Sequence, residues 1–240
     1  YDLINDIDLI VVTKKLNKTI FNNYLKLIKK VDPNKLGINR DKLKINTSFG
    51  PLKFNNFKNE IIIHLMIYDI KGHIDHVIKS PFTTLDWERS CYFKNGRLKD
   101  LFPTGTLQLR DFIESRRGTE NYLNDLKNKR ISYREYGFLG KTYFTKRLNQ
   151  RLIERDKFEY IYHIVRNLIL NYIKFRKQNN RLTIFKKNQK EIKNKLGNKF
   201  FNKNIKKINT LIDCKNKIDH KKSSYFDKWI ISFVRDFQKI

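Results

Sequence analysis

The chain has 240 residues and carries 52 lysines and arginines against 24 aspartates and glutamates, a formal net charge of +28. A hydrophobic fraction of 40% and an aromatic fraction of 13% supply enough apolar surface for packed cores, which excludes a globally disordered chain. This length accommodates one large domain or two small ones, and we expect two.

The basic charge favours polyanionic partners, such as RNA, DNA or the phosphates of a nucleotide. The sequence is also crowded with Lys, Asn and Ile, which an AT-rich genome over-produces. A solvated basic surface therefore explains the charge as well as a nucleic-acid partner does.

The two cysteines, Cys91 and Cys214, have no C-x-x-C spacing, so we expect neither a disulfide framework nor a zinc site, and a cytoplasmic protein. The longest apolar runs fall well short of the roughly 20 residues that a membrane span needs, and no signal peptide is visible. Because the first residue is Tyr1 and the best motif follows at once, we expect a truncated amino terminus.

Four elements are predicted in the first part of the chain. Residues 9–12 form a β-branched run typical of a buried strand, and residues 17–30 have the apolar spacing of a helix that ends at Asp32-Pro33. Residues 42–46 and 60–69 are predicted strands, with a turn at residues 49–51 between them. This order predicts an α+β domain with a small mixed β-sheet, which we assign to residues 1–105.

From Leu85 onward the pattern becomes helical, and residues 106–240 are expected to form an all-helical domain that covers the cleft and is Lys-rich at its end. A helix over residues 107–126 is expected to break near Gly118. Residues 133–145 suggest a hairpin or a loop, and residues 156–176 form the clearest helix, with Asp156 as its N-cap. Further helical segments are predicted near residues 183–196, 199–212 and 223–238.

The acidic pair Asp6 and Asp8 directly precedes the first strand. Residues two apart on a strand point to the same side, so both carboxylates are expected to face one cleft. Two carboxylates on one side of a strand suit a pair of Mg²⁺ ions that hold a triphosphate and an attacking hydroxyl in line. The motif therefore predicts phosphoryl or nucleotidyl transfer supported by two Mg²⁺ ions, or by Mn²⁺.

The segment Asn5-Asp6-Ile7-Asp8, followed by the strand Leu9-Ile10-Val11-Val12, resembles the D-x-D motif and strand of the polymerase-beta-like nucleotidyltransferase superfamily, which includes the minimal and antibiotic-modifying enzymes. The likeness covers about a third of the chain, and it implies that Asp6 and Asp8 are the first two metal ligands. The family's Gly-Ser turn would fall upstream of Tyr1. Asp69 is our nominee for the family's third carboxylate; alternatively His64 occupies that place, and the domain is a degenerate, non-catalytic relative.

Several basic and polar residues are candidates for binding substrate. Arg116 and Arg117 stand beside Gly118 in a segment that suits a phosphate-facing loop or an exposed basic turn. Glu159, His163 and Arg166 share a helical stripe that either acts on an acceptor hydroxyl and its phosphates or forms an interhelical hydrogen-bond network.

Two further features have weaker functional interpretations. The pair His73 and His76 has no additional ligands nearby and is not expected to bind a metal. The Lys-rich segment at residues 186–222 suits a nucleic-acid backbone, with Phe200 and Phe201 either stacking on bases or packing in a helical core.

The sequence thus predicts a Mg²⁺-dependent nucleotidyltransferase that moves a nucleoside monophosphate from a nucleoside triphosphate to a hydroxyl on RNA, protein or a small molecule. One alternative is a catalytically inactive nucleotidyltransferase-fold module that binds RNA or acts as an antitoxin-like partner. A phosphate-handling hydrolase with the same acidic pair is the other. The simplest explanation of Asp6 and Asp8, an acidic turn before a buried strand, requires no site at all.

Overall fold

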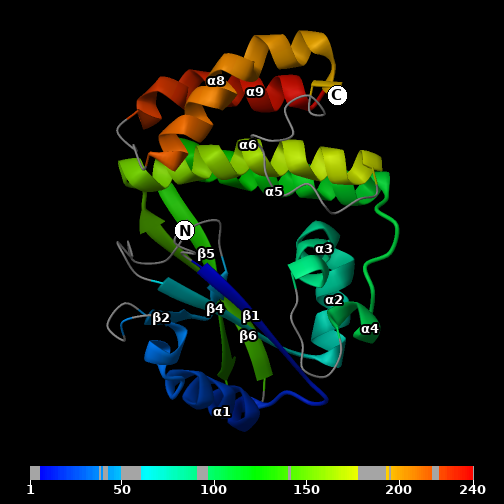
Figure 1. Cartoon of the computed structure of the whole chain (residues 1–240), viewed down its shortest axis with the longest axis vertical. Coiled ribbons are helices and arrows are strands. Elements are labelled where there is room, and N and C mark those ends of the chain that lie inside the picture. The colour runs from blue at the N-terminus through cyan, green and yellow to red at the C-terminus, as the bar shows by residue number, and fades with distance from the viewer. Residues whose placement is uncertain are drawn as a thin grey trace. The chain divides into compact units, whose positions relative to one another are not determined.

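The computed structural model describes residues 6–37, 39, 43–49, 61–90, 97–139, 142–177, 193, 194, 196–217 and 222–239 (Figure 1). The chain divides into two compact units: unit 1 comprises Tyr1–Asp75 and Ser132–Asn149, and unit 2 comprises His76–Ile131 and Gln150–Ile240. A single boundary near residue 105 was expected. Instead, residues 76–105 group with the helical residues, and residues 132–149 return to unit 1 because a strand of this segment pairs with residues 48 and 49.

The first sheet, in unit 1, has three parallel strands in the order β1-β4-β2, which are Asp6–Thr13, Ile61–Asp69 and Leu43–Asn46. We expected a mixed sheet, and these strands are all parallel. The central strand β4 is buried along most of its length, on its even-numbered as well as its odd-numbered side, so both faces of the strand are covered. Its near-continuous apolar run made it readable as a strand.

Helix α1, Lys18–Lys29, covers one face of this sheet. Asn17 caps the helix, because its side-chain oxygen accepts a hydrogen bond of 2.9 Å from the backbone N–H of Ile20. Phe21 packs with the odd-numbered strand residues to form the core of unit 1, whose members include Ile7, Leu9, Val11, Ile63, Leu65 and Ile67. Since side chains alternate along a strand, the even-numbered residues Asp8 and His64 belong to the opposite face.

The second sheet contains β3 at Ser48–Phe49, β5 at Arg130–Leu139 and β6 at Thr142–Arg151, in the order β3-β5-β6. Strand β3 pairs antiparallel with β5, with Ser48 opposite Glu135. Of the two alternatives predicted for residues 133–145, a hairpin or a loop, the structure contains the hairpin. Its strands are longer than predicted. The side chains of residues 133–139 and 142–148 lie outside the described part of the structure.

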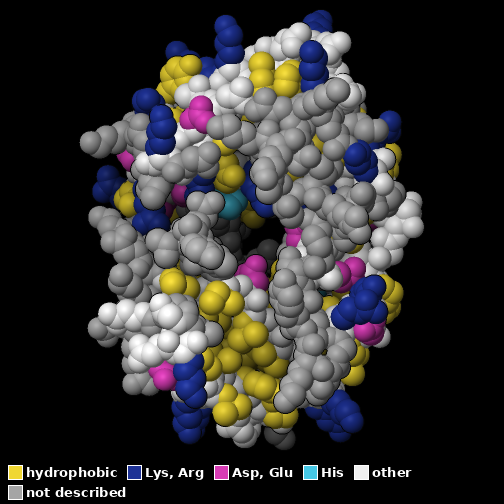
Figure 2. Space-filling view, in the orientation of Figure 1, with side chains coloured by type: hydrophobic (Ala, Val, Ile, Leu, Met, Phe, Trp, Pro, Cys, Tyr) yellow, Lys and Arg dark blue, Asp and Glu magenta, His cyan; other side chains and the backbone are white. Residues whose placement is uncertain are grey.

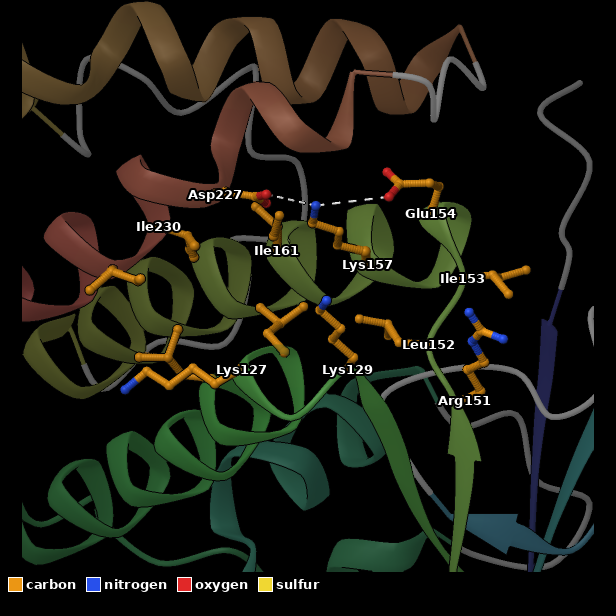
Figure 3. A pocket seen from close by; sticks show the side chains of 13 residues that line it. Lys127, Lys129, Arg151, Leu152, Ile153, Glu154, Lys157, Ile161, Asp227 and Ile230 are labelled. Atoms are coloured by element: carbon orange, nitrogen blue, oxygen red, sulfur yellow. Dashed lines mark hydrogen bonds and ion pairs between the residues drawn. The ribbon is translucent and has the colours of Figure 1, made fainter.

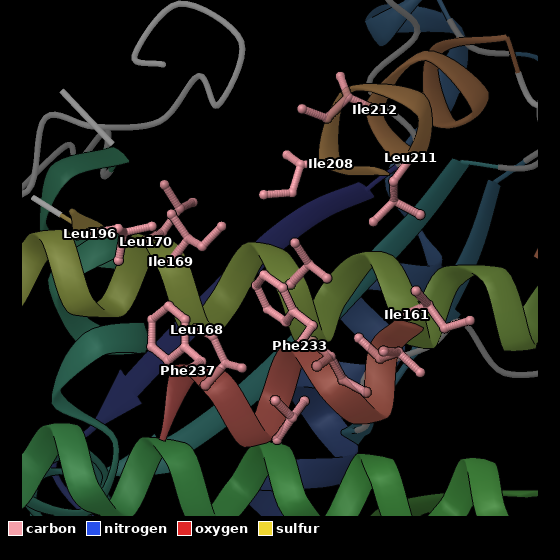
Figure 4. Close-up of a cluster of buried hydrophobic side chains, with 14 of the residues drawn as sticks. Ile161, Leu168, Ile169, Leu170, Leu196, Ile208, Leu211, Ile212, Phe233 and Phe237 are labelled. Carbon is pink, nitrogen blue, oxygen red and sulfur yellow. The ribbon is translucent and has the colours of Figure 1, made fainter. Parts of the chain in front are cut away.

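Unit 2 consists mainly of helices around the long helix α6, Glu154–Lys177. Phe158, Ile161, Ile164, Ile169 and Ile173 of this helix are fully buried, and each contributes about 1.5–3 kcal/mol through burial. Figure 4 shows that side chains of α8 and α9 approach α6 from different sides to complete this core. The remaining helices are α2 (Ile70–Lys79, which begins in unit 1), α3 (Pro81–Ser90), α4 (Leu98–Leu101), α5 (Leu109–Lys127), α8 (Asn198–Asn216) and α9 (Asp227–Phe237).

Two details of the helices differ from what the sequence predicted. Helix α5 runs through Gly118 without the expected break, because one glycine costs a helix only about 1 kcal/mol and α5 packs on α6. The series of helices that follows β4 begins at Ile70 rather than near Leu85. The predicted helix at residues 183–196 falls largely outside the described residues. No helix of the described chain is long and apolar enough to cross a membrane.

Asp156 is the third residue of α6 rather than its N-cap, and burial raises the pKa of its carboxyl above the ordinary value of 3.8. The folded protein therefore holds this proton more tightly than the unfolded chain. As pH rises through the window between the unfolded and folded pKa, the proton is lost and stability falls. At neutral pH the buried carboxylate is a destabilising charge.

We expect Asp156→Asn to raise the melting temperature at neutral pH and to lose this effect in acid, below the ordinary pKa of the carboxyl. Thermal unfolding followed by circular dichroism across pH measures the difference. Asp100→Asn, at the same helical position of α4, is the control with the opposite sign, because hydrogen bonds from Arg97 lower the pKa of Asp100. Equal pH dependence of Asp156→Asn and the wild type would contradict the assignment.

Candidate functional site

A row of polar residues crosses the parallel sheet of unit 1 on the face opposite α1. The strand register sets Asp8 of β1 beside His64 of β4, and His64 beside Asn46 of β2. His64 interrupts the apolar run of β4, and Asn46 ends β2. The row therefore brings a carboxylate, an imidazole and an amide together on one face of the sheet.

The imidazole of His64 contacts both neighbours. Its Nδ1 lies 3.8 Å from Asp8 Oδ1, and its Nε2 lies 3.5 Å from Asn46 Nδ2. The side chain of Asp8 is 54% exposed and that of His64 is 21% exposed, whereas Asn46 is buried. The exposed end of the row is thus the carboxylate, and the buried amide lies behind the ring.

Asp6 precedes Asp8 by two residues on β1, and its backbone pairs with Ile62. Its side chain lies outside the described part of the structure. The prediction that both carboxylates face one cleft therefore stays a prediction for Asp6.

Asp69 lies five residue pairs farther along the same two strands than Asp8, since it pairs with Thr13 at the end of β1. At about 3.3 Å per residue this places it roughly 16 Å away from Asp8 along the strand direction. Its Oδ1 accepts a hydrogen bond of 2.7 Å from the backbone N–H of Gly72 in the first turn of α2. The structure thus separates Asp69 from Asp8 and gives it the contacts of a helix cap.

We expect Asp69→Ala to lower the free energy of unfolding by about 1 kcal/mol, the usual cost of losing a helix cap. Asp69→Asn retains an oxygen that can accept from Gly72 and should be nearly neutral. Chemical denaturation measures both changes, and Mn²⁺ titration of Asp69→Asn checks for a loss of metal affinity. If Asp69→Asn lowers the Mn²⁺ affinity as much as Asp8→Asn does, Asp69 is a metal ligand after all.

Arg116 and Arg117 lie on α5 instead of in a loop. Arg116 stacks over the ring of Phe112 with 5.1 Å between the guanidinium carbon and the ring centroid, and donates to the backbone oxygen of Gln238. Arg117 donates to Glu114 one turn earlier on the same helix. Both guanidinium groups therefore have partners within unit 2.

Glu159 is the centre of an interhelical network rather than an open stripe. Both of its oxygens accept from Lys215 Nζ of α8, at 2.5 and 2.6 Å, and His163 Nε2 lies 3.8 Å from Oε2. Arg166 donates to the side chain of Asn167 beside it. These contacts match the network that the sequence analysis held as an alternative to catalysis.

Two other candidate features are placed within the helices. His76 stacks on Trp87 at 4.6 Å between ring centroids, and His73 is buried in the same helix. Phe200 and Phe201 pack in or against the core of unit 2. On the face drawn in Figure 2, the dark blue Lys and Arg side chains of described residues are scattered instead of forming one track.

The donors at the polar row suit a divalent cation. Two cis ligands with metal bonds of about 2.1 Å lie about 3 Å apart, so Asp8 Oδ1 and His64 Nδ1 need to approach by less than about 1 Å to share an ion. No group of three or more His, Cys, Asp and Glu side chains occurs among the described residues, of which the Asp6 side chain is not one. The described part of the site is thus a carboxylate and an imidazole.

Asp8 and His64 were both considered from the sequence, and Asn46 was missed. Asn46 ends the short strand β2 opposite the middle of β4, and no local feature of the sequence indicates this pairing. Compared with known proteins, the chain matches no family model, no curated protein and no solved structure.

Proposed function

We propose that unit 1 is a divalent-cation-dependent nucleotidyltransferase domain, which moves a nucleoside monophosphate from a nucleoside triphosphate to a hydroxyl acceptor. The observation that carries the proposal is the pairing of an exposed Asp8 carboxylate with the partly buried His64 imidazole on the face of the parallel sheet opposite α1. Asp6, two residues earlier on β1, would supply a second carboxylate.

Asp6, Asp8 and His64 would hold the cation, which supplies charge neutralisation at the triphosphate. The other residues of unit 1 would hold these ligands in position. Asn46 would accept a hydrogen bond from Nε2–H with its amide oxygen turned to the ring, which leaves Nδ1 available to the ion. The core beneath the odd-numbered side fixes the backbone of β1 and β4. Because imidazole suits softer ions than carboxylate does, this donor set favours Mn²⁺ relative to Mg²⁺.

The proposal is tested by incubating the full chain with nucleoside triphosphates labelled at the α-phosphate, with Mn²⁺ or Mg²⁺, and with RNA or the chain itself as the acceptor. The expected result is label covalently attached to an acceptor together with release of pyrophosphate. Labelled nucleotide products in solution without a labelled acceptor would identify a phosphate-handling hydrolase. If neither a labelled acceptor nor a labelled nucleotide product forms, the proposal that unit 1 is catalytic is wrong.

A second candidate is a catalytically silent module of the same fold that binds RNA. The observation in its favour is His64 itself, which stands opposite Asp8 where an active nucleotidyltransferase is expected to carry a carboxylate. This module would bind RNA without transfer, and its affinity would fall steeply with salt as bound counterions are released. Filter binding at increasing salt concentrations, beside the transfer assay, separates the two candidates.

We expect His64→Asp to shift the metal preference of transfer from Mn²⁺ towards Mg²⁺, changing the ratio of the two rates by about tenfold, because an oxygen donor replaces a nitrogen donor. His64→Gln is the matched control, since it removes the nitrogen ligand without adding a charge. Transfer rates at saturating metal give the ratio for each protein. Wild-type ratios in both variants would place His64 outside the metal site.

A further inference from the structure

A cavity of about 350 Å³ opens in unit 2, where the end of α5, the residues after β6, α6 and α9 converge (Figure 3). Its volume falls within the range of roughly 300–1,000 Å³ that small-molecule sites occupy. Two of its aliphatic side chains, Ile153 and Ile231, are 41% and 38% exposed. The aliphatic lining consists of Leu123, Leu126, Leu152, Ile153, Ile161, Ile230 and Ile231.

The charged lining has an excess of cations. Lys157 Nζ lies 2.7 Å from Asp227 Oδ2 and 3.9 Å from Glu154 Oε1, so this single lysine engages the two acids of the cavity. The other basic side chains of the lining, which are Lys127, Lys129 and Arg151, form no ion pair with any described residue. The cavity therefore holds uncompensated positive charge beside apolar surface.

Lys129 occupies an unfavourable backbone conformation at this cavity. Its φ is 49°, in the left-handed region, where a residue with a β-carbon costs about 1–2 kcal/mol relative to glycine. It follows the end of α5, a position at which glycine is the usual choice. Its backbone oxygen accepts a hydrogen bond of 2.9 Å from Leu152 N, which holds the residue next to the segment that carries Arg151. A lysine here keeps a cation at the cavity despite the cost.

From these observations we propose that the cavity of unit 2 binds a small amphiphilic anion, with an apolar body against the aliphatic lining and a phosphate or carboxylate beside Lys129 and Arg151. An anion is favoured over an uncharged occupant, because an uncharged molecule would remove water from Lys129 and Arg151 without offering them another hydrogen-bond acceptor. The apolar lining and limited volume select a small molecule rather than a nucleic-acid backbone. The proposal concerns unit 2 alone and does not depend on the cation site of unit 1.

The test uses the full chain and the fluorescent anion 8-anilinonaphthalene-1-sulfonate, with the uncharged N-phenyl-1-naphthylamine for comparison. We expect saturable binding of one sulfonate probe per chain, and weaker binding of the uncharged probe. Arg151→Gln and Lys129→Gly should each weaken sulfonate binding by about tenfold, the effect of one charge-assisted contact, and should not weaken binding of the uncharged probe.

Lys129→Gly also separates binding from folding, since glycine relieves the left-handed backbone and should leave the melting temperature unchanged or raised. Lys199→Gln, on the exposed start of α8, is the control for a general loss of positive charge. Displacement of the probe by phenyl phosphate or by benzoate identifies the acidic group. Displacement by neither, or equal sulfonate affinity in all three variants, would overturn the proposal.

Discussion

Replacing Asp8 with asparagine is expected to lower nucleotidyl transfer by more than about 100-fold and to weaken Mn²⁺ binding at the same time. The carboxylate is the most exposed donor of the polar row, so it is the group that a cation and a triphosphate meet first. Neighbours that merely orient metal ligands already contribute about 10–100-fold, and loss of a ligand should exceed this. Asparagine preserves the shape of the side chain, and the fold should be retained.

Mn²⁺ titration followed by electron paramagnetic resonance measures the binding, and the labelled-nucleotide assay measures the transfer. Asp75→Asn is the matched control, because Asp75 is an exposed aspartate of α2 in the same unit, beyond the far end of β4. Its substitution should leave both quantities unchanged. Equal Mn²⁺ affinity in Asp8→Asn and Asp75→Asn would remove the metal-site hypothesis.

The largest stability effect is expected in unit 2, where Lys174 of α6 is buried and its Nζ lies 2.5 Å from Asp86 Oδ1 of α3. Asp86→Ala removes the carboxylate and leaves the buried ammonium without this counter-charge. Removing one partner of a buried ion pair costs roughly 3 kcal/mol, whereas replacing both partners with apolar residues is often neutral or stabilising. Denaturant titration of the variant should show this loss in the free energy of unfolding.

The control is an ion pair of the same length on the protein surface. Arg117 and Glu114 lie 2.5 Å apart on α5 but are both largely exposed, so Glu114→Ala should cost no more than about 1 kcal/mol. The double variant Asp86→Ala/Lys174→Met should recover part of the loss, because methionine tolerates burial without a partner. If Asp86→Ala and Glu114→Ala have the same effect, the buried charge is not the cause.

Much of the local structure follows from short-range patterns in the sequence. The run Leu9–Val12 and the segment 60–69 predicted strands because both are rich in branched apolar residues, and the structure contains β1 and β4 there. The apolar spacing after Asp156 predicted the helix that became α6. These features are decided by neighbours within a few residues, which a single sequence displays.

Pairing between strands could not be predicted in the same way. Which residue of β4 stands opposite Asp8 depends on register, and a shift by one residue would replace His64 with an apolar side chain. Asp69 was nominated for its carboxylate, although an acid directly before a helix also has the signature of a cap. An aspartate can be a metal ligand or a helix cap, and the two roles are distinguished only when the position of the other strands is known.

The helical unit shows a second limit of local patterns. Gly118 suggested a break and a phosphate-facing loop at Arg116 and Arg117, yet packing against α6 carries the helix through it. Lys215, which binds Glu159, lies 56 residues away in sequence and has no local signal. Because of this tertiary contact, Glu159 belongs to an interhelical network and not to the catalytic stripe that the sequence suggested.

The most direct test of the cation site is the electron spin echo of Mn²⁺ bound to the full chain. We predict that the echo is modulated by a directly bonded nitrogen, that His64→Gln abolishes this modulation, and that Asp8→Asn releases the ion. Mn²⁺ that binds without nitrogen modulation and stays bound in Asp8→Asn would contradict a metal site on this face of the sheet.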